Sequence, residues 1–180
     1  MSIRRAQASD AGAIAVVHVR SWQAAYRGLL PQDYLDGLDP GPRVARWEQR
    51  LAERDWPRGG VLVAEDAGQV VGLTNFCPSR DDDLDLRAVG EITMIYLLAA
   101  AWGRGHGREL MAGALAALGQ AGYGEAALWV LDTNQRARRF YEAGGWRTDG
   151  AAKQEPWRDA GFTLSEVRYR HALPALTGRR

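Results

Sequence analysis

Glycine recurs at every second position in the run Gly103-Arg104-Gly105-His106-Gly107. The run follows a long β-like stretch, residues 89–98, and precedes residues 108–118, whose apolar side chains recur at helical spacing. Because glycine has no Cβ, successive backbone N–H groups of such a turn can approach a ligand closely, and the N-terminus of the following helix favours an anion. The segment therefore predicts a strand, an anion-binding turn and a helix.

The glycine turn does not fit the common nucleotide-binding motifs. Arg108 stands where a GxGxxG motif counted from Gly103 needs its last glycine. A Walker A loop requires a Gly-Lys pair, and Lys153 is the only lysine in the chain. A dinucleotide or a nucleoside triphosphate is therefore disfavoured as the ligand, while a purely structural turn stays open at this point.

Length and composition indicate one folded domain. The chain has 180 residues, of which 46% are hydrophobic and 25% charged, which is typical of a single globular domain. A formal net charge of +1 gives no general attraction to nucleic acid. The longest apolar run, residues 95–102, is far shorter than the ~20 residues that span a bilayer. Cys77 is the sole cysteine, and no secretory signal is evident, so we expect a cytoplasmic protein without nucleic-acid or membrane partners.

The remaining patterns predict an α/β domain with helices at the start, a β-hairpin in the middle and a β–α–β–α unit after it. We expect helices over residues 10–26, 31–38, 43–54, 108–118 and 134–143, and strands over residues 3–6, 61–65, 69–77, 89–98, 126–131, 145–147 and 164–171. Residues 78–87 are polar and are expected to form a solvated connection. The last residues, 173–180, are expected to form a flexible basic tail.

Asn134 and Tyr141 are seven residues apart in one predicted helix. Seven residues turn the helix by about 700°, so both side chains lie on nearly the same face, about 10 Å apart along the axis. One ligand could contact both of them. Taken singly, Asn134 is as well explained by a helix cap and Tyr141 by half-buried packing.

Two segments resemble the GNAT superfamily of acetyl-CoA-dependent N-acetyltransferases. They are Ile95-Tyr96-Leu97-Leu98-Ala99-Ala100-Ala101-Trp102 with the glycine turn, and Asn134-Gln135-Arg136-Ala137-Arg138-Arg139-Phe140-Tyr141-Glu142-Ala143-Gly144-Gly145-Trp146. The order of predicted elements, from Ile3 to His171, fits the same family. Two departures are Ala99, where members often have proline, and Trp102, where many have arginine or glutamine.

The resemblance implies a fold and a cosubstrate. We expect residues 1–172 to form one GNAT-like domain with a mixed, mostly antiparallel sheet flanked by helices. Acetyl-CoA is the implied cosubstrate, with its pyrophosphate on the backbone amides of the glycine turn and its pantetheine along the preceding strand. The residues expected to bind it are Ile95, Leu97, Gly103, Arg104, Gly105, His106, Gly107, Arg108, Asn134 and Tyr141.

Acetyl transfer to an amine requires a base, because an amine with a pKa of ~10 is almost entirely protonated at pH 7. Similar family members often carry a glutamate where Glu91 begins the long strand, so Glu91 is our candidate base, with Asp83, Asp85 and Asp132 as alternatives. Strand alternation places Met94 on the opposite face of the strand from Glu91.

Tyr141 is the candidate acid, since its phenol can protonate the departing thiolate. Backbone amides in residues 95–97 would stabilise the oxyanion. Cys77 could instead form an acetyl-enzyme, but no histidine is near it in sequence, so direct transfer is favoured.

The acceptor is expected to be a small-molecule amine that enters over the first helices, with Trp22 and Tyr26 as a wall of its site or as core residues. His18, His106 and His171 show no metal-like spacing, and no metal is assigned. A non-catalytic acyl-CoA sensor and a peptide N-terminal acetyltransferase are the alternative functions, and a homodimer is left open.

Overall fold

The computed structural model describes residues 1–53, 55–157 and 161–174. The described helices are α1 (Ala11–Ala25), α2 (Gln32–Asp36), α3 (Gly41–Ala52), α4 (His106–Gln120) and α5 (Gln135–Ala143), and short 3-10 turns occur at Ala8–Asp10 and Ala99–Ala101. The strands are β1 (Ser2–Arg5), β2 (Gly60–Asp66), β3 (Gln69–Pro78), β4 (Val89–Leu97), β5 (Glu125–Leu131), β6 (Arg147–Pro156) and β7 (Thr163–Ala172).

The described strands form one seven-stranded sheet in the order β1-β2-β3-β4-β5-β7-β6. Among these strands, β4 and β5 are the parallel pair, and every other neighbouring pair is antiparallel. This confirms the expected single α/β domain with a mixed, mostly antiparallel sheet. The connection from β4 to β5 runs through α4, as a parallel pair requires a crossover.

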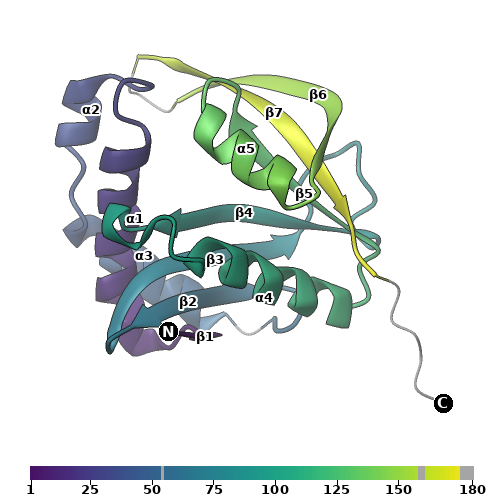
Figure 1. The fold of residues 1–180 in the computed structure, drawn as a ribbon, viewed down its shortest axis with the longest axis horizontal. Helices are drawn as coiled ribbons and strands as arrows, with labels where there is room; N and C mark the ends of the chain where they lie inside the picture. Colours follow the sequence, from purple (N-terminus) through teal and green to yellow (C-terminus); the bar gives the residue numbers. More distant parts are fainter. Residues whose placement is uncertain (54, 158–160, 175–180) are drawn as a thin grey trace.

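Helices cover both faces of the sheet (Figure 1). On one face, α4 packs Leu110, Ala114 and Leu118 against β2, β3 and β4. On the other face, α1 packs Ile14 and Val17 against the same strands, with α3 behind it. The apolar stripes read from the sequence are therefore the ones that form the core. No helix within the described ranges is long and apolar enough to cross a membrane.

The parallel pair β4–β5 separates soon after it begins. Described pairing between the two strands runs only from Val89 to Glu91 on β4 and from Glu125 to Ala127 on β5. Beyond this point β4 stays paired to β3, and β5 stays paired to β7 along its whole length. The sheet therefore opens between β4 and β5, and the diverging ribbons can be followed in Figure 1.

A β-bulge in β4 corrects one expectation about side-chain direction. The register steps from Cys77 opposite Glu91 to Asn75 opposite Met94, so β4 holds one extra residue. Cys77 and Asn75 share a face of β3, and their partners Glu91 and Met94 therefore share a face of β4. Strand alternation alone had placed Met94 on the opposite face, which is wrong because the bulge reverses the alternation.

The structure also corrects expected boundaries. β6 runs over Arg147–Pro156 rather than residues 145–147. The sequence does not predict its full length, because most of its side chains are exposed and show no apolar alternation, and the strand is formed by pairing with β7. Helix α4 begins at His106 rather than residue 108. Leu173, where the tail was expected to begin, is buried in the core, and its N–H donates to the Gly124 carbonyl. Residue 54 of the third expected helix and residues 175–180 of the expected tail lie outside the described residues.

Candidate active site

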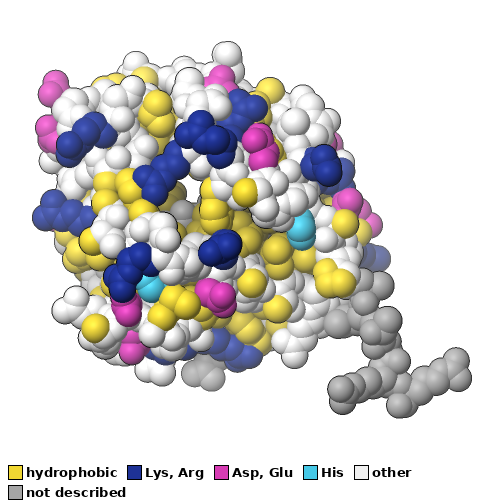
Figure 2. Space-filling view, in the orientation of Figure 1, with side chains coloured by type: hydrophobic (Ala, Val, Ile, Leu, Met, Phe, Trp, Pro, Cys, Tyr) yellow, Lys and Arg dark blue, Asp and Glu magenta, His cyan; other side chains and the backbone are white. Residues whose placement is uncertain are grey.

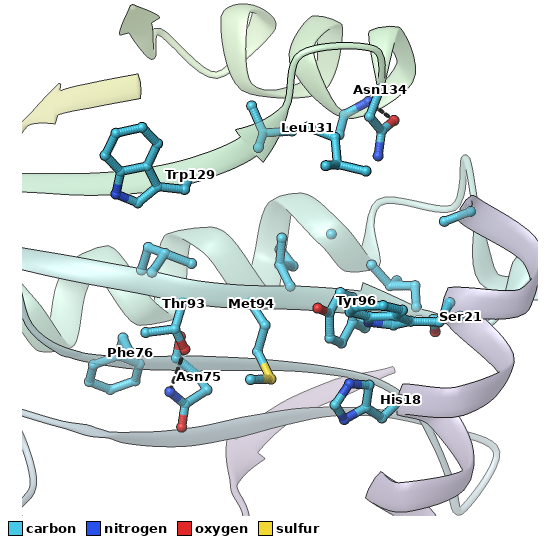
Figure 3. Close-up of a pocket in the computed structure, with 18 of the residues that line it drawn as sticks. His18, Ser21, Asn75, Phe76, Thr93, Met94, Tyr96, Trp129, Leu131 and Asn134 are labelled. Carbon is cyan, nitrogen blue, oxygen red and sulfur yellow. Dashed lines mark hydrogen bonds between the residues drawn. The ribbon is translucent and has the colours of Figure 1, made fainter. Parts of the chain in front are cut away.

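A cavity of about 960 Å³ occupies the opening between β4 and β5. Figure 2 shows the hollow on this face, with hydrophobic side chains inside it and Lys and Arg side chains around its rim. In Figure 3, Trp129 and Leu131 of β5 lie on one side of the cavity, and Thr93, Met94 and Tyr96 of β4 lie on the other. The cavity reaches from the glycine turn to α1 and the β6–β7 end of the sheet.

The glycine turn forms one end of the cavity. Gly103 and Gly105 have φ angles of 73° and 91°, a left-handed conformation that favours glycine. Gly105 is the residue directly before α4, so the helix N-terminus faces this end. Gly107 and Arg108, in the first turn of α4, line the cavity with Gly103 and Gly105. This geometry suits an anion held by backbone N–H groups and the helix dipole.

Two residues of the turn direct their side chains elsewhere. Arg104 pairs with Asp66 at 3.0 Å between Nη2 and Oδ2, and the buried His106 has Nε2 at 3.7 Å from the same Asp66 oxygen. Neither residue is among those that line the cavity. Arg104 and His106 could therefore contribute to a ligand site only through their backbone groups.

The free edge of β4 continues from the glycine turn into the cavity. Ile95 and Leu97 both line it, in the stretch of β4 that has separated from β5. The Trp102 indole Nε1 donates to the Leu97 carbonyl at 3.1 Å, and the Arg136 guanidinium lies 3.4 Å from the centre of the Trp102 ring. Trp102 therefore bridges β4 and α5, a role that its place in the sequence does not indicate.

Asn134 and Tyr141 both line the cavity from α5, as their spacing indicated. Asn134 is the N-cap of α5, where Oδ1 accepts a hydrogen bond from the Ala137 N–H at 3.1 Å, so its capping role is confirmed. Tyr141 packs against Phe140, Trp146 and Tyr169. Burial raises the pKa of the Tyr141 phenol well above its usual range. The phenol therefore remains a proton donor throughout the neutral range.

Glu91 is 2% exposed at the deep part of the cavity. Arg80 holds its carboxylate: Nη2 donates to Oε1 at 2.6 Å, and Nε and the backbone N–H donate to Oε2 at 3.0 and 3.1 Å. An almost fully buried carboxylate needs such compensation, because an unpaired buried charge is costly. The Arg80 guanidinium itself is largely exposed.

The loop that carries Arg80 is anchored to β7. The buried Arg168 guanidinium donates to Asp83 at 2.7 Å and to Asp81 at 3.2 Å, and Asp81 also accepts from Trp129 Nε1 at 2.9 Å. Residues 78–87 are mostly exposed, as expected for a solvated connection, and Asp81 and Asp83 also anchor this connection to Arg168 of β7. The sequence does not indicate these anchors, because Arg168 lies 85 residues after Asp83.

The structure does not bring the alternative bases into the cavity. Asp83, Asp85 and Asp132 are absent from its described lining. Glu166 of β7 does line it, and burial raises the pKa of that carboxyl while Lys153 opposes the rise, with its Nζ 3.4 Å away. Sequence reasoning missed Glu166, although alternation within the predicted last strand could have placed one acidic side chain toward the sheet's inner face.

Aromatic side chains of α1, β4 and the segment after β6 form one wall of the cavity. Trp22 is buried against Tyr26 and Trp157, with ring centres 4.9 and 5.5 Å apart, and Tyr96 lies 6.3 Å from Trp22. All four line the cavity. Trp22 thus serves both as a core residue and as a wall, the two roles that the sequence left open. Burial raises the pKa of Tyr96 to about 12 and that of Tyr26 well above its usual range.

His18 lies beside this aromatic cluster, and its environment makes the stability of the fold depend on pH. Its ring stacks on Tyr96 at 5.0 Å, and burial, assisted by the charges of Arg43 and Arg50, lowers its pKa from 6.5 to about 4. The unfolded chain therefore binds a proton that the folded chain does not, so His18 stabilises the fold above pH 6.5 and loses that contribution as the pH falls toward 4.

In His18→Phe, the free energy of unfolding is expected to fall less between pH 7 and pH 4.5 than in the unchanged protein, by up to about 3 kcal/mol. Urea unfolding at several pH values measures the difference. Parallel curves for the two proteins would show that His18 titrates alike in the folded and unfolded chains.

Comparisons with known proteins agree with this geometry. The model of the acetyltransferase (GNAT) family matches residues 21–146. A Bacillus subtilis (strain 168) protein described as the uncharacterized N-acetyltransferase YuaI is 32% identical over 168 residues, which cover 93% of this chain and 90% of that protein. An uncharacterized N-acetyltransferase of Archaeoglobus fulgidus is 36% identical over 141 residues, 78% of this chain and 89% of its own.

Solved structures share the fold along nearly the whole chain. YncA of Salmonella typhimurium, determined with acetyl-CoA, superposes with a TM-score of 0.71 at 22% identity and covers 100% of this chain and 98% of its own. The PaiA N-acetyltransferase of Thermoplasma acidophilum, determined with coenzyme A, gives a TM-score of 0.72 at 16% identity, covering 95% and 98%. Because the family model covers residues 21–146 and the Bacillus and Archaeoglobus proteins are 32% and 36% identical to it, the chain belongs to the acetyltransferase (GNAT) family, which its two sequence motifs resemble.

Proposed function

We propose that this protein transfers the acetyl group of acetyl-CoA to a primary amine of a small molecule by direct attack. The observation that carries the proposal is the continuous cavity between β4 and β5. It joins an anion-binding glycine turn at one end to a buried carboxylate and an aromatic enclosure at the other. Two substrates that enter from opposite ends would therefore meet beside the free edge of β4.

The glycine-turn half of the cavity suits coenzyme A. The diphosphate would lie on the N–H groups from Gly103 to Arg108, at the start of α4. The pantetheine arm would follow β4 past Ile95 and Leu97, facing Asn134 across the opening. Support comes from the Salmonella and Thermoplasma proteins of the same fold, which were determined with acetyl-CoA and coenzyme A.

The other half supplies the groups for transfer. Glu91 would remove the proton of the acceptor ammonium, directly or through water, and the nitrogen lone pair would then attack the thioester carbon. Free N–H groups on β4 would stabilise the oxyanion. When the C–S bond breaks, Tyr141 would protonate the thiolate, and the second nitrogen proton would pass through water to restore the Tyr141 phenol as the amide forms. Because both Glu91 oxygens are bonded to Arg80, Glu166, with its raised carboxyl pKa, is the second candidate base.

The environment of Cys77 argues against a route through an acetylated cysteine. The thiol lines the cavity beside Glu91, and burial together with that carboxylate raises its pKa to about 11. A thiol that stays protonated is a poor nucleophile at neutral pH. Direct transfer therefore remains the proposed route.

A small acceptor is favoured over a peptide because the acceptor end is closed by contacts between distant segments. Trp157, at the end of β6, donates from Nε1 to the Tyr34 hydroxyl of α2 at 2.7 Å, and Phe162 packs on the Tyr34 ring at 5.2 Å. These contacts join the β6–β7 end of the sheet to α2 (Figure 1). The cytoplasmic location and the homodimer stay predictions.

Thermal melting tests the cosubstrate. Acetyl-CoA at about 100 times its dissociation constant is expected to stabilise the protein by ~2.7 kcal/mol, because it binds only the folded state. In Gly107→Val the shift should largely disappear, since a Cβ at Gly107 would stand between Phe140 and Leu97 in the cavity without requiring a left-handed backbone. Gly105 is less suitable for this test because its φ of 91° would strain any side chain.

The matched control is Gly119→Ala, a glycine of the same helix with open space around its Cβ position. Its melting shift with acetyl-CoA should equal that of the unchanged protein. A shift with NAD or ATP but not with acetyl-CoA, or an undiminished shift in folded Gly107→Val, would contradict the assignment of the glycine turn to coenzyme A.

A further inference from the structure

Two arginines of α3 face the acceptor end of the cavity. Arg43 and Arg50 are seven residues apart, so they lie on one stripe of the helix, with the buried Trp47 between them. Both line the cavity together with His18 of α1. The Arg50 guanidinium lies 5.7 Å from the centre of the Trp47 ring, which fixes the direction of this stripe.

Arg43 and Arg50 have no ion-pair partner among the described residues, in contrast to Arg80 and Lys153, which line the same cavity. Arg80 is paired with Glu91, and Lys153 with Glu166. Within residues 1–53, 55–157 and 161–174, no carboxylate lies within ion-pair distance of Arg43 or Arg50. The Arg43 Nε is moreover buried and accepted by no described group. A half-buried guanidinium with an unsatisfied N–H is costly unless a ligand completes it.

Arg43 and Arg50 act electrostatically on the same group of cavity residues. The positive charges of Arg43 and Arg50 both lower the pKa of His18. The charge of Arg43 also acts to lower the pKa of Tyr96, and that of Arg50 the pKa of Cys77. Cys77 is directly opposite Glu91 in the β3–β4 register. The unpaired cations and the proposed base therefore flank one space. His18 is neutral at pH 7 and has an unpartnered, buried Nδ1.

We propose that the acceptor is an amino-acid-like zwitterion whose carboxylate is bound by Arg43 and Arg50 while its amine lies toward Glu91. The inference rests on the proposed acetyl transfer and adds the chemical class of the acceptor. Guanidinium groups suit this role, because they bind carboxylates through paired, charge-assisted hydrogen bonds. Both arginines line the same cavity as Glu91, so the carboxylate and the ammonium of one zwitterion would each face a group of opposite charge.

Matched acceptor pairs test the inference. Coenzyme A release would be measured with the twenty common amino acids and with carboxylate-free counterparts, such as L-methionine against 3-(methylthio)propylamine and L-phenylalanine against phenethylamine. The best amino acid is expected to exceed its counterpart in kcat/KM by about 10- to 100-fold, the effect of charged hydrogen bonds in a partly enclosed site. Arg43→Gln and Arg50→Gln should each lower this ratio toward one, chiefly because the KM for the amino acid rises.

Two further variants sharpen the result. Arg43→Lys keeps the charge but not the paired hydrogen bonds, so its ratio should lie between those of the unchanged protein and Arg43→Gln. Arg46→Gln removes an exposed arginine of the same helix that does not line the cavity, and it should change nothing. A counterpart amine that matches or exceeds every amino acid, or a ratio that survives in folded Arg43→Gln and Arg50→Gln, would overturn the inference.

A binding measurement separates this inference from the proposed function. The coenzyme A complex would be titrated with N-acetyl-L-methionine and with N-acetyl-3-(methylthio)propylamine by calorimetry. Tighter binding of the compound with the carboxylate, if Arg43→Gln abolishes the preference, supports the arginine site. If no amine is acetylated at the same time, the proposed acetyl transfer is refuted while the arginine site stands. Equal binding of the two compounds, or binding of neither, overturns the arginine site whatever the turnover.

Discussion

Glu91→Gln is expected to lower kcat by roughly 10²–10⁴-fold, the usual contribution of a positioned general base. The substitution keeps the shape of the side chain and its ability to accept a hydrogen bond from Arg80, but it cannot take a proton from the acceptor. Steady-state assays of coenzyme A release at pH 7 to 9 measure the loss. The melting shift with acetyl-CoA should be preserved, because Glu91 lies at the acceptor end of the cavity.

The control for this experiment is Asp132→Asn. Asp132 was an alternative base in the sequence, but it does not line the cavity in the described structure, so its removal should leave kcat unchanged. Glu166→Gln is the informative companion. If Glu91→Gln keeps full turnover while Glu166→Gln loses it, the base is Glu166, and the ion pair of Glu91 with Arg80 has a structural role.

Tyr141→Phe is expected to lower kcat by about 10²-fold near pH 7, at the lower end of the range for a general acid. The phenylalanine ring preserves the packing against Phe140, Trp146 and Tyr169, and only the hydroxyl is removed. The loss should shrink as the pH rises, because thiolate leaves more readily without a proton at high pH. A pH–rate profile from pH 6 to 9 shows this convergence.

Burial raises the pKa of Tyr141, so its own ionisation should not lower activity within that pH range. Tyr123→Phe is the matched control: it removes another buried tyrosine hydroxyl, which has no hydrogen-bond partner in the described structure and does not line the cavity. Equal turnover of Tyr141→Phe and Tyr123→Phe at every pH would remove Tyr141 from the chemistry.

Local sequence patterns were sufficient for most of the fold. The 3.6-residue spacing of Ile14 and Val17 in α1, and of Leu110, Ala114 and Leu118 in α4, predicted the faces that form the two halves of the core. The glycine turn was evident because only glycine adopts the left-handed angles of positions 103 and 105 without strain. Asn134 and Tyr141 were paired correctly because helix geometry relates residues seven apart.

Patterns failed where side chains carry no periodic signal. β6 is exposed along most of its length, and its backbone pairing with β7 comes from a partner later in the chain. The bulge that turns Met94 to the side of Glu91 is likewise a property of the β3–β4 register. Both features depend on pairing with another strand, so the residues of the segment alone do not predict them.

The candidate site depended most on contacts between distant segments. Local sequence marks Glu91 as an acidic residue at the start of a strand, but only the fold places Arg80 on it and seats Asp83 on Arg168, 85 residues away. Charges act through space over a few ångströms in a medium of low polarity, so their partners depend on tertiary packing. For the same reason Arg43 and Arg50, which have no ion-pair partner in the described part of the chain, resemble an ordinary charged helix face in the sequence. They become a candidate acceptor site only because α3 meets the cavity.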